Sequence, residues 1–356
     1  MSNKKNFIKT LALASVLVMS SQASAGDSIA GFVYVGPVGD HGWSYQHDQG
    51  RQGVEKELGI KTTFVESVAE GADAERVIRK LASSGNKIIF TTSFGYMNPT
   101  NKVAKQFPDV KFEHATGYKR GNNVSTYSGR YYEGRAVIGT IAGMMTKSNV
   151  IGYIASFPIP EVVRGINAMT LAARKVNPKV EVKVVWVNSW FDPGKEGDAA
   201  KALIDQGADI ITQHTDSPAP LQVAEQRGVF GFGQASDMHE FAPTMQLTAI
   251  VDNWTGYYTN RIKAALDGTW ESTDTWHGLK EGMVVMAPYS DAVPADVRAA
   301  ADKVRDDIIA GSLHPFAGPI NNQAGEEVVK AGASIADGDL AGMDWYVEGV
   351  QGKLPK

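Results

Sequence analysis

The chain has 356 residues, enough for two domains of ordinary size, with a formal net charge of −4 and 21% charged residues. This near-neutral balance gives no indication of binding to nucleic acid or to an anionic membrane surface. A hydrophobic fraction of 43% is normal for a packed globular protein and argues against long disordered segments.

The N-terminus has the pattern of an exported protein. Lysines at positions 4, 5 and 9 precede the apolar run 11–19, and Ala23-Ser24-Ala25 is a small-x-small cleavage site. We therefore expect residues 1–25 to be a secretory signal peptide, the alternative being a short buried helix. The sequence has no cysteine for a lipid anchor or a disulfide. No later run reaches the roughly 18 to 20 apolar residues that span a bilayer, so we expect a soluble periplasmic protein.

Strands and helices then alternate at short intervals. Residues 29–35 are an apolar, β-branched run that ends at Gly36-Pro37, and residues 43–58 have helical character closed by Gly59. Further strands are predicted at 61–67, 87–92 and 110–113, with helices at 72–84 and in the segment before Pro108. Alternation of this kind predicts a parallel, doubly wound sheet.

A second series of the same kind follows. The predicted helices are 131–145, which is rich in Gly and Ala and suited to close packing, 162–175, 197–206, 221–227 and 254–266. The predicted strands are 150–154, 181–187, 209–212, 229–232 and 248–251, and an extended segment at 276–286 precedes the amphipathic helix 295–310.

Two series of similar size predict an α/β protein made of two Rossmann-like lobes with parallel sheets. No Pro/Ser-rich or Gly/Ser-rich tether separates the series, so we expect a hinge of several short chain crossings. The expected first lobe is 26–147 plus about 252–280, the second is 148–251 plus about 281–320, and 321–356 is a C-terminal extension.

Aromatic and polar residues gather after the predicted strands, where open α/β sheets bind their ligands. Trp43, Trp190 and Trp254 all fall in these segments, and each is accompanied by an Asn or Asp. The chemistry-bearing residues there are Asp40, His41, Ser93, Phe94, Tyr96, Asn98, Asn188, Asp192, His214, Asp216, Gln234, Asp237 and Asp252. Aromatic faces with a few fixed polar groups suit a planar heterocycle, which is stacked on its faces and recognised at its edge.

Plainer interpretations stay open for several of these residues. Any one of the tryptophans can be a plug at the end of the core, and Asp40 can be the N-cap of the helix that follows it. The histidines lack metal-ligand spacing, and the chain has no G-x-S-x-G, Walker A or G-x-G-x-x-G motif. We therefore expect a binding protein without metal or cofactor and not an enzyme.

Three segments carry a resemblance to a known family. They are Gly39-Asp40-His41-Gly42-Trp43, Pro158 to Gly165 (PIPEVVRG) and Gly233-Gln234-Ala235-Ser236-Asp237. With these three segments in this order along the sequence, the chain resembles the basic membrane protein family, the purine nucleoside receptors of bacterial ABC transporters. The resemblance covers roughly residues 29–319. The resemblance implies the fold of type I periplasmic binding proteins, a purine ligand and a membrane permease as partner.

The resemblance also implies roles for individual residues. Trp43 and Trp190 match the two aromatic rings that hold the purine. Asn98, four residues after Phe94, stands where the family has an Asp that reads the base. Asp237 matches the Asp that binds the sugar. An amide both donates and accepts hydrogen bonds, whereas an ionised carboxylate only accepts.

One departure from the family bears on the ligand. The family has a Lys that reaches the ribose shortly after the strand corresponding to 248–251, and this chain has Asp252-Asn253-Trp254 there. Less room and fewer donors for a sugar favour a free, adenine-like purine base, with a purine nucleoside as the alternative. Tyr96, His214 and Trp254 are expected to complete the wall of the site, and Asp40 is a further candidate contact.

The expected mechanism is capture by closure of the two lobes, followed by docking on an ABC permease. We expect a monomer with no nucleic-acid partner. Two rival functions remain at this point: a periplasmic enzyme that acts on nucleosides, and a sensor subunit that delivers its ligand to a receptor.

Overall fold

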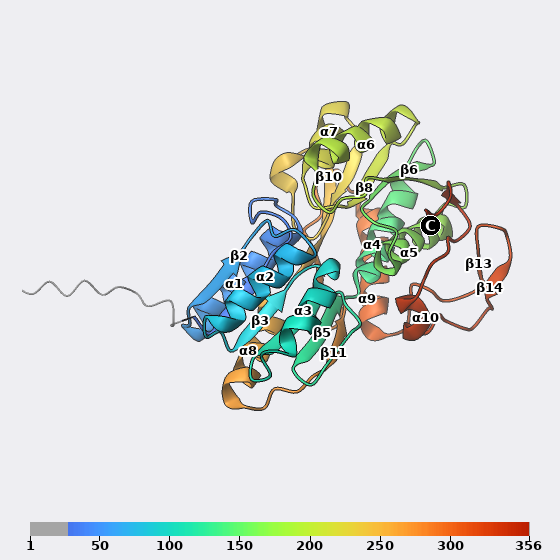
Figure 1. Cartoon of the computed structure of the whole chain (residues 1–356). Coiled ribbons are helices and arrows are strands. Elements are labelled where there is room, and N and C mark those ends of the chain that lie inside the picture. The colour runs from blue at the N-terminus through green and yellow to red at the C-terminus, as the bar shows by residue number, and fades with distance from the viewer. Residues whose placement is uncertain (1–27, 356) are drawn as a thin grey trace, which may run out of the picture.

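The computed structural model describes residues 28–355, so the predicted signal peptide lies outside the described residues. The chain forms two α/β lobes: the first is mostly blue to cyan with residues 255–277 in orange, and the second is mostly green to yellow with residues 295–310 in orange-red (Figure 1). The first lobe comprises residues 28–129 and 255–277, and the second comprises residues 131–252 and 284–310 together with the C-terminal extension.

The first lobe is built on a six-stranded parallel sheet of order β11-β5-β4-β3-β1-β2. Its strands are β1 (Ala30–Val33), β2 (Thr62–Val65), β3 (Ile88–Thr91), β4 (Lys111–Ala115), β5 (Val124–Gly129) and β11 (Asp274–His277). Its helices are α1 (Trp43–Leu58), α2 (Ala72–Ser83), η1 (Phe94–Tyr96), α3 (Met97–Ala104) and α8 (Thr255–Asp267). The parallel arrangement places all strand carboxyl ends at one edge of the sheet.

The second lobe has a seven-stranded sheet of order β12-β10-β9-β8-β6-β7-β15, in which only β12 is antiparallel to its neighbour. Its strands are β6 (Val150–Ala155), β7 (Glu181–Trp186), β8 (Ile210–His214), β9 (Phe230–Gly233), β10 (Gln246–Asp252), β12 (Val284–Met286) and β15 (Val350–Gln351). Its helices are α4 (Tyr131–Met145), α5 (Pro160–Val176), α6 (Pro193–Asp205), α7 (Ala219–Arg227), η2 (His239–Phe241) and α9 (Ala295–Ala310).

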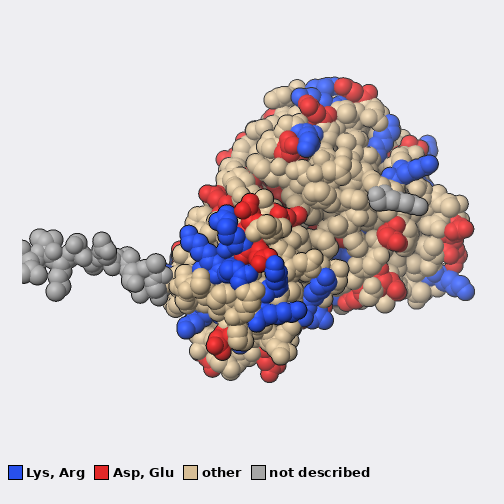
Figure 2. Space-filling view, in the orientation of Figure 1, with Lys and Arg blue, Asp and Glu red and all other residues tan. Residues whose placement is uncertain are grey.

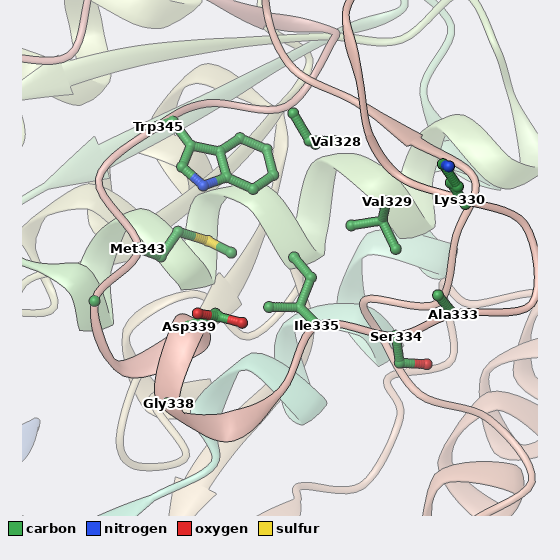
Figure 3. Close-up of a pocket in the computed structure, with 11 residues that line it drawn as sticks. Val328, Val329, Lys330, Ala333, Ser334, Ile335, Gly338, Asp339, Met343 and Trp345 are labelled. Atoms are coloured by element: carbon green, nitrogen blue, oxygen red, sulfur yellow. The ribbon is translucent and has the colours of Figure 1, made fainter.

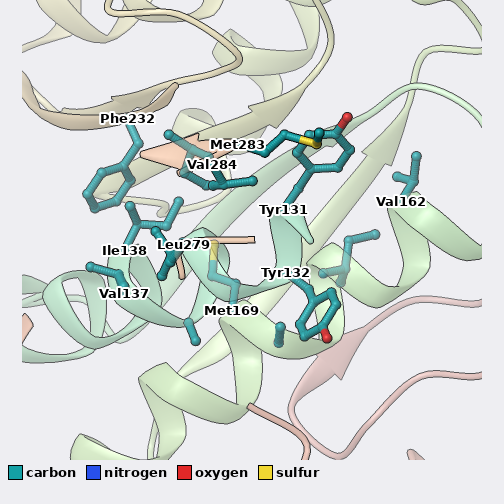
Figure 4. Packing of buried hydrophobic residues seen from close by; sticks show 14 of the residues in the cluster. Tyr131, Tyr132, Val137, Ile138, Val162, Met169, Phe232, Leu279, Met283 and Val284 are labelled. Carbon is teal, nitrogen blue, oxygen red and sulfur yellow. The ribbon is translucent and has the colours of Figure 1, made fainter. Parts of the chain in front are cut away.

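Helix α4 lies in the second lobe, although the sequence analysis assigned residues up to 147 to the first. It packs between α5 and α9, and its apolar side chains meet those of β12 and the preceding loop (Figure 4). The Gly and Ala content explains the closeness of α4 and α5, because a Cβ on Gly139 would lie 2.5 Å from the carbonyl oxygen of Met169. The chain therefore first crosses between the lobes at residues 129–131.

Three chain crossings join the lobes: 129–131, 252–255 and 277–284. They are tied to one another by backbone hydrogen bonds. Arg130 N–H donates to the carbonyl of His277 (2.7 Å), and Asn253 N–H donates to the carbonyl of Met283 (2.8 Å). The three crossings thus form a continuous hinge strip, which is the connection that the absence of a tether predicts.

The C-terminal extension belongs to the second lobe. It contains β13 (Ile320–Asn321), β14 (Glu327–Val329) and α10 (Asp337–Ala341), and it ends by adding β15 to β7 (Figure 1). Two α5 side chains hold it: Arg164 donates to the carbonyl of Leu340 (2.6 Å) and Asn167 donates to that of Trp345 (2.8 Å).

Lys and Arg side chains gather on the face of the first lobe that α2 and α3 present (Figure 2). Carboxylates lie among them: Glu75 pairs with both Arg79 (2.8 Å) and Lys102 (2.8 Å). Residues 28–129 and 253–279 carry 14 basic against 13 acidic side chains, so this face belongs to a lobe of almost zero net charge.

Candidate functional site

A narrow cavity lies where the strand ends of the two lobes face each other. The first lobe contributes residues that follow β1, β3 and β4, and the second contributes residues from α5 and from the ends of β7, β8 and β9. Its lining is Val35, Trp43, Ser93, Phe94, Thr116, Glu161, Trp190, His214, Asp216 and Gln234. The space between the atoms of the cavity is about 360 Å³ in all, and the centre of a water molecule can occupy only about 20 Å³ of it. The cavity is therefore a thin slot at the usual ligand position of such sheets.

Two tryptophans from different lobes form part of this lining. Trp43 begins α1, and its indole N–H donates to the carbonyl of Thr92 (2.6 Å), which fixes the ring against β3. Trp190 follows β7 and packs against Phe157, with ring centroids 5.2 Å apart. Each indole is thus held by its own lobe, and both line the same slot.

Behind Trp43 lies a layer of aromatic rings. His47 meets Trp43 edge to face at a centroid distance of 4.3 Å, and Tyr131 does so at 6.1 Å. Trp254 is only 1% exposed and stacks on His47 at 4.6 Å. Burial without a charged partner lowers the pKa of His47 well below its ordinary value, so this layer is neutral at pH 7.

The lobes touch each other beside the cavity. A Cβ on Gly42 would overlap the backbone carbonyl of Asp216, so the first-lobe loop and the second-lobe loop are in direct contact. The hydroxyl of Ser236 donates to the carbonyl oxygen of His41, and the His41 ring lies 3.2 Å from a carboxylate oxygen of Glu240. The structure is therefore the closed form of the two-lobe protein.

The second lobe supplies the charged groups of the cavity. Glu161, in the first turn of α5, lies 3.4 Å from Nε2 of His214 and accepts a long hydrogen bond from Ser128 (3.4 Å). Burial lowers the pKa of His214, although Glu161 acts in the opposite direction. A neutral His214 donates from Nε2 to Glu161 and leaves the carboxylate able to accept from a ligand.

Asp216 is the second acidic group of the cavity. Its Oδ2 is buried and has no hydrogen-bond partner among the described residues. Burial, followed by the negative charges of Asp40, Glu196 and Asp252, raises the pKa of Asp216 well above its ordinary value. Asp252, at the end of β10, is also fully buried with both oxygens unpartnered.

Of the nine predicted site residues, the structure brings four together on the cavity wall: Trp43, Phe94, Trp190 and His214. Two others from the first lobe point elsewhere. Tyr96 is fully buried in the core of that lobe, where its hydroxyl donates to the carbonyl of Val68 (2.5 Å). Asn98 is exposed and accepts a hydrogen bond from Lys119 (2.9 Å).

The remaining three also lie off the wall. Asp40 is buried, and its carboxylate accepts from the backbone N–H groups of Gly42, Ser44 and Tyr45 at 2.8 to 3.1 Å. These bonds cap the start of helix α1, which is the plainer of the two roles considered for Asp40 in the sequence analysis. Asp237 is exposed and accepts from Gln246 (2.6 Å). Trp254 lies in the layer behind Trp43 rather than in the slot.

Six lining residues were not among the predicted site residues: Val35, Ser93, Thr116, Glu161, Asp216 and Gln234. Five of them lie one or two residues after the end of a strand, so this position was the sequence feature that could have identified them as site residues. Glu161 is different, because it begins helix α5 after a β6 loop and reaches the cavity from the helix N-terminus.

A larger hollow of about 710 Å³ lies on the C-terminal extension. Val329, Ile335, Met343 and Trp345 surround it, with Lys330 and Asp339 at its sides (Figure 3). It is a shallow surface depression of one lobe, made mostly of aliphatic and small residues, and strand ends of the main sheets do not reach it. The slot between the lobes is therefore the better candidate site.

Within residues 28–355 no group of three or more His, Asp or Glu side chains is arranged to hold a metal ion. In the same part of the chain, no helix combines the length and apolar character needed to cross a membrane.

Known proteins resemble this chain over most of its length. The family model for PnrA-like ABC transporter substrate-binding proteins matches residues 28–313. A purine-binding protein of Brucella abortus is 61% identical over 328 residues, covering 92% of this chain and 93% of that protein. A Haloferax volcanii protein named for glucose binding in an ABC transporter is 39% identical over 334 residues, covering 93% and 83%.

Solved structures share the architecture at low identity. An ABC transporter solute-binding protein from Aeropyrum pernix superposes with a TM-score of 0.70 at 20% identity, covering 82% of this chain and 94% of that one. A transcriptional activator from Bacillus halodurans gives 0.69 at 22% identity, covering 81% and 100%. These likenesses confirm the predicted two-lobe α/β fold.

Proposed function

Because the chain belongs to the family of PnrA-like ABC transporter substrate-binding proteins, we propose that it captures a free, adenine-like purine base between its lobes. The family resemblance seen in the sequence is thereby confirmed. Proteins of this family are not enzymes: they bind small-molecule ligands outside the cytoplasmic membrane and work with permease components. For this chain, the signal-peptide pattern supports delivery to the periplasm.

The observation that carries the proposal is the placement of Trp43 and Trp190 on one thin slot from opposite lobes. Stacking of a base on an aromatic ring is worth about 1–3 kcal/mol. Two such contacts supply a large part of the about 8 kcal/mol that a micromolar Kd requires. Only the closed form offers both rings, so binding and closure are coupled.

The polar groups of the slot support a purine over a ligand without N–H donors. Glu161 and Asp216 are acceptors in a site from which water is largely excluded, and purine bases carry N–H groups on their edges. The name of the relative from Brucella abortus supports the same ligand class.

The volume supports a base without its sugar. We expected Trp254 to exclude a ribose sterically, but Trp254 packs behind Trp43 and does not line the slot. Any exclusion of a ribose therefore depends on the narrowness of the slot. Only about 20 Å³ of the slot is open to the centre of a water molecule, so a flat base requires less widening of the slot than a nucleoside, whose ribose nearly doubles the heavy atoms of adenine.

A purine nucleoside remains a second candidate because of one observation. A second cavity, with about 180 Å³ open to the centre of a water molecule against about 20 Å³ in the slot, adjoins the slot and shares Phe94, Thr116 and Glu161 with it. Its other walls include Ser128, Arg164 and Trp276, which suit a polar substituent. A ribose that passed between the two spaces would occupy this second cavity.

Isothermal titration tests the proposal directly. Purified protein, unfolded and refolded to remove carried ligand, is titrated with adenine, hypoxanthine, adenosine, guanosine and glucose. We expect micromolar or tighter binding of adenine and weaker binding of the others. Trp43→Ala is the matched loss-of-binding control. Tighter binding of adenosine than adenine would replace the base by a nucleoside, and binding of glucose alone would overturn the purine proposal.

A further inference from the structure

Asp216 lies at the seam between the two indoles of the slot. Its backbone N–H donates to the backbone carbonyl of Trp190 (2.9 Å), which ties the two loops of the second lobe together. Its own carbonyl is in contact with Gly42, the residue before the first-lobe ring Trp43. Any ligand atom that reaches the Asp216 carboxyl therefore lies near the line along which the lobes meet.

The carboxyl of Asp216 is prepared for a donor that the protein itself does not provide. The residue is 6% exposed, it lines the slot, and Oδ2 has no partner. Leaving a buried acceptor unpaired costs about 1–3 kcal/mol, and more when it is charged. A site that retains such a group has a use for it in the ligand-bound state.

The acidic neighbours of Asp216 have partners of their own. Asp40 accepts three backbone N–H groups at the start of α1. Glu196 accepts from the Ser217 hydroxyl (2.7 Å) and backbone (3.0 Å) and from the Asp192 backbone (2.8 Å). The charges that raise the pKa of Asp216 come from these groups and from Asp252, all of which are acidic. The group best suited to the Asp216 carboxyl is therefore an N–H donor or a cation.

We propose that Asp216 accepts the imidazole-ring N–H of a free purine and is the residue that discriminates a base from its N-substituted derivatives. This inference rests on the proposed function, because it assigns an edge of the same ligand. A purine loses this N–H when a sugar or methyl group replaces the hydrogen. The substituted ligand then leaves Asp216 unpaired.

Rejection of the substituted ligand follows from the loss of this one pairing. A site built to pair with a ligand N–H rejects an analogue that lacks it far more strongly than an apolar pocket rejects an extra methyl group.

The experiment compares adenine with 9-methyladenine, which keeps the ring face and the amino edge. Titrations are run on the wild type, Asp216→Ala, Asp216→Asn and the control Asp198→Asn, an exposed residue of α6 in the same lobe. We expect the wild type to bind adenine at least about 30-fold more tightly than 9-methyladenine. In Asp216→Ala adenine binding falls about 10- to 100-fold, while 9-methyladenine binding changes less than about 3-fold.

Asp216→Asn keeps an acceptor oxygen and has the smaller loss, and Asp198→Asn leaves both affinities unchanged. Thermal melting shows that each variant is folded. If the wild type binds adenine but the ratio of the two affinities is the same in Asp216→Ala, the inference fails and the proposed function stands. If the wild type binds no purine, both fail.

Discussion

The indole of Trp254 meets that of Trp43 edge to face, with ring centroids 5.7 Å apart and ring planes at 80°. Trp43 is half-buried at the slot and Trp254 is buried behind it. Trp43 therefore lines the slot, whereas Trp254 packs behind it and fixes the orientation of its ring. Their separate roles lead to different expectations for the two substitutions.

Trp43→Ala removes one stacking face, so we expect adenine affinity to fall about 5- to 150-fold, corresponding to about 1–3 kcal/mol. Trp254→Phe keeps an aromatic ring in the layer behind, and we expect it to lower stability by about 1–3 kcal/mol with a smaller loss of affinity. Calorimetric titration and chemical unfolding measure the two effects. A larger affinity loss for Trp254→Phe than for Trp43→Ala would place Trp254 in contact with the ligand.

Asp40→Ala removes the acceptor for three backbone N–H groups at the start of α1. We expect the free energy of unfolding to fall by about 1–2 kcal/mol, as for other helix caps. Adenine affinity should fall much less than in Trp43→Ala, because Asp40 does not line the slot. Equal affinity losses in the two variants would make Asp40 a ligand contact rather than a cap.

Gly42→Ala tests closure without changing a ligand contact. The added Cβ overlaps the Asp216 carbonyl only when the lobes are closed, so we expect a folded protein that remains open and binds adenine at least about tenfold more weakly. Gly39→Ala is the matched control in the same loop, because a Cβ there has no neighbour within 4 Å. Small-angle scattering with and without adenine measures the closure. Normal compaction of Gly42→Ala on adding adenine would contradict this account.

The stability difference between wild type and Asp216→Asn should depend on pH. Burial and acidic neighbours raise the pKa of Asp216 in the folded protein, so the folded state binds more protons than the unfolded state. The wild type therefore loses stability as pH rises through the folded pKa, whereas an amide has no such loss. We expect ligand-free Asp216→Asn to melt about 2 °C higher than wild type at pH 8 and equally near pH 4. Thermal melts across this range check it, and a variant that melts lower at pH 8 would contradict it.

Much of the fold could be predicted because local patterns and tertiary packing agree. Helix α1 has the predicted bounds, since Gly59 ends it in a left-handed conformation. Strand β5 was not predicted, because its Ser and Thr residues do not give the continuous apolar run that is typical of a strand buried on both faces. The segment 276–286 reads as one extended run, but it contains strands of two lobes separated by a turn at Gly282.

Trp43 and Trp190, singled out because they lie in loops after predicted strands, both line the slot, and their role as ligand contacts stays a prediction. Sequence position alone does not give side-chain direction, and this separates Phe94 at the slot from Tyr96 in the core two residues later. Asp216 was noted after its strand but was not chosen. What distinguishes it is an absence of partners, which only the folded arrangement reveals.

The hydrogen-bonded hinge strip constrains how the protein moves. Crossings tied together at Arg130–His277 and Asn253–Met283 resist sliding of one lobe past the other and leave rotation about the strip as the soft coordinate. Trp43 and Trp190, which line the slot from opposite lobes, then approach each other along one arc. The proposed ligand would meet the two rings in an orientation set by the hinge strip, at a distance from the slot itself.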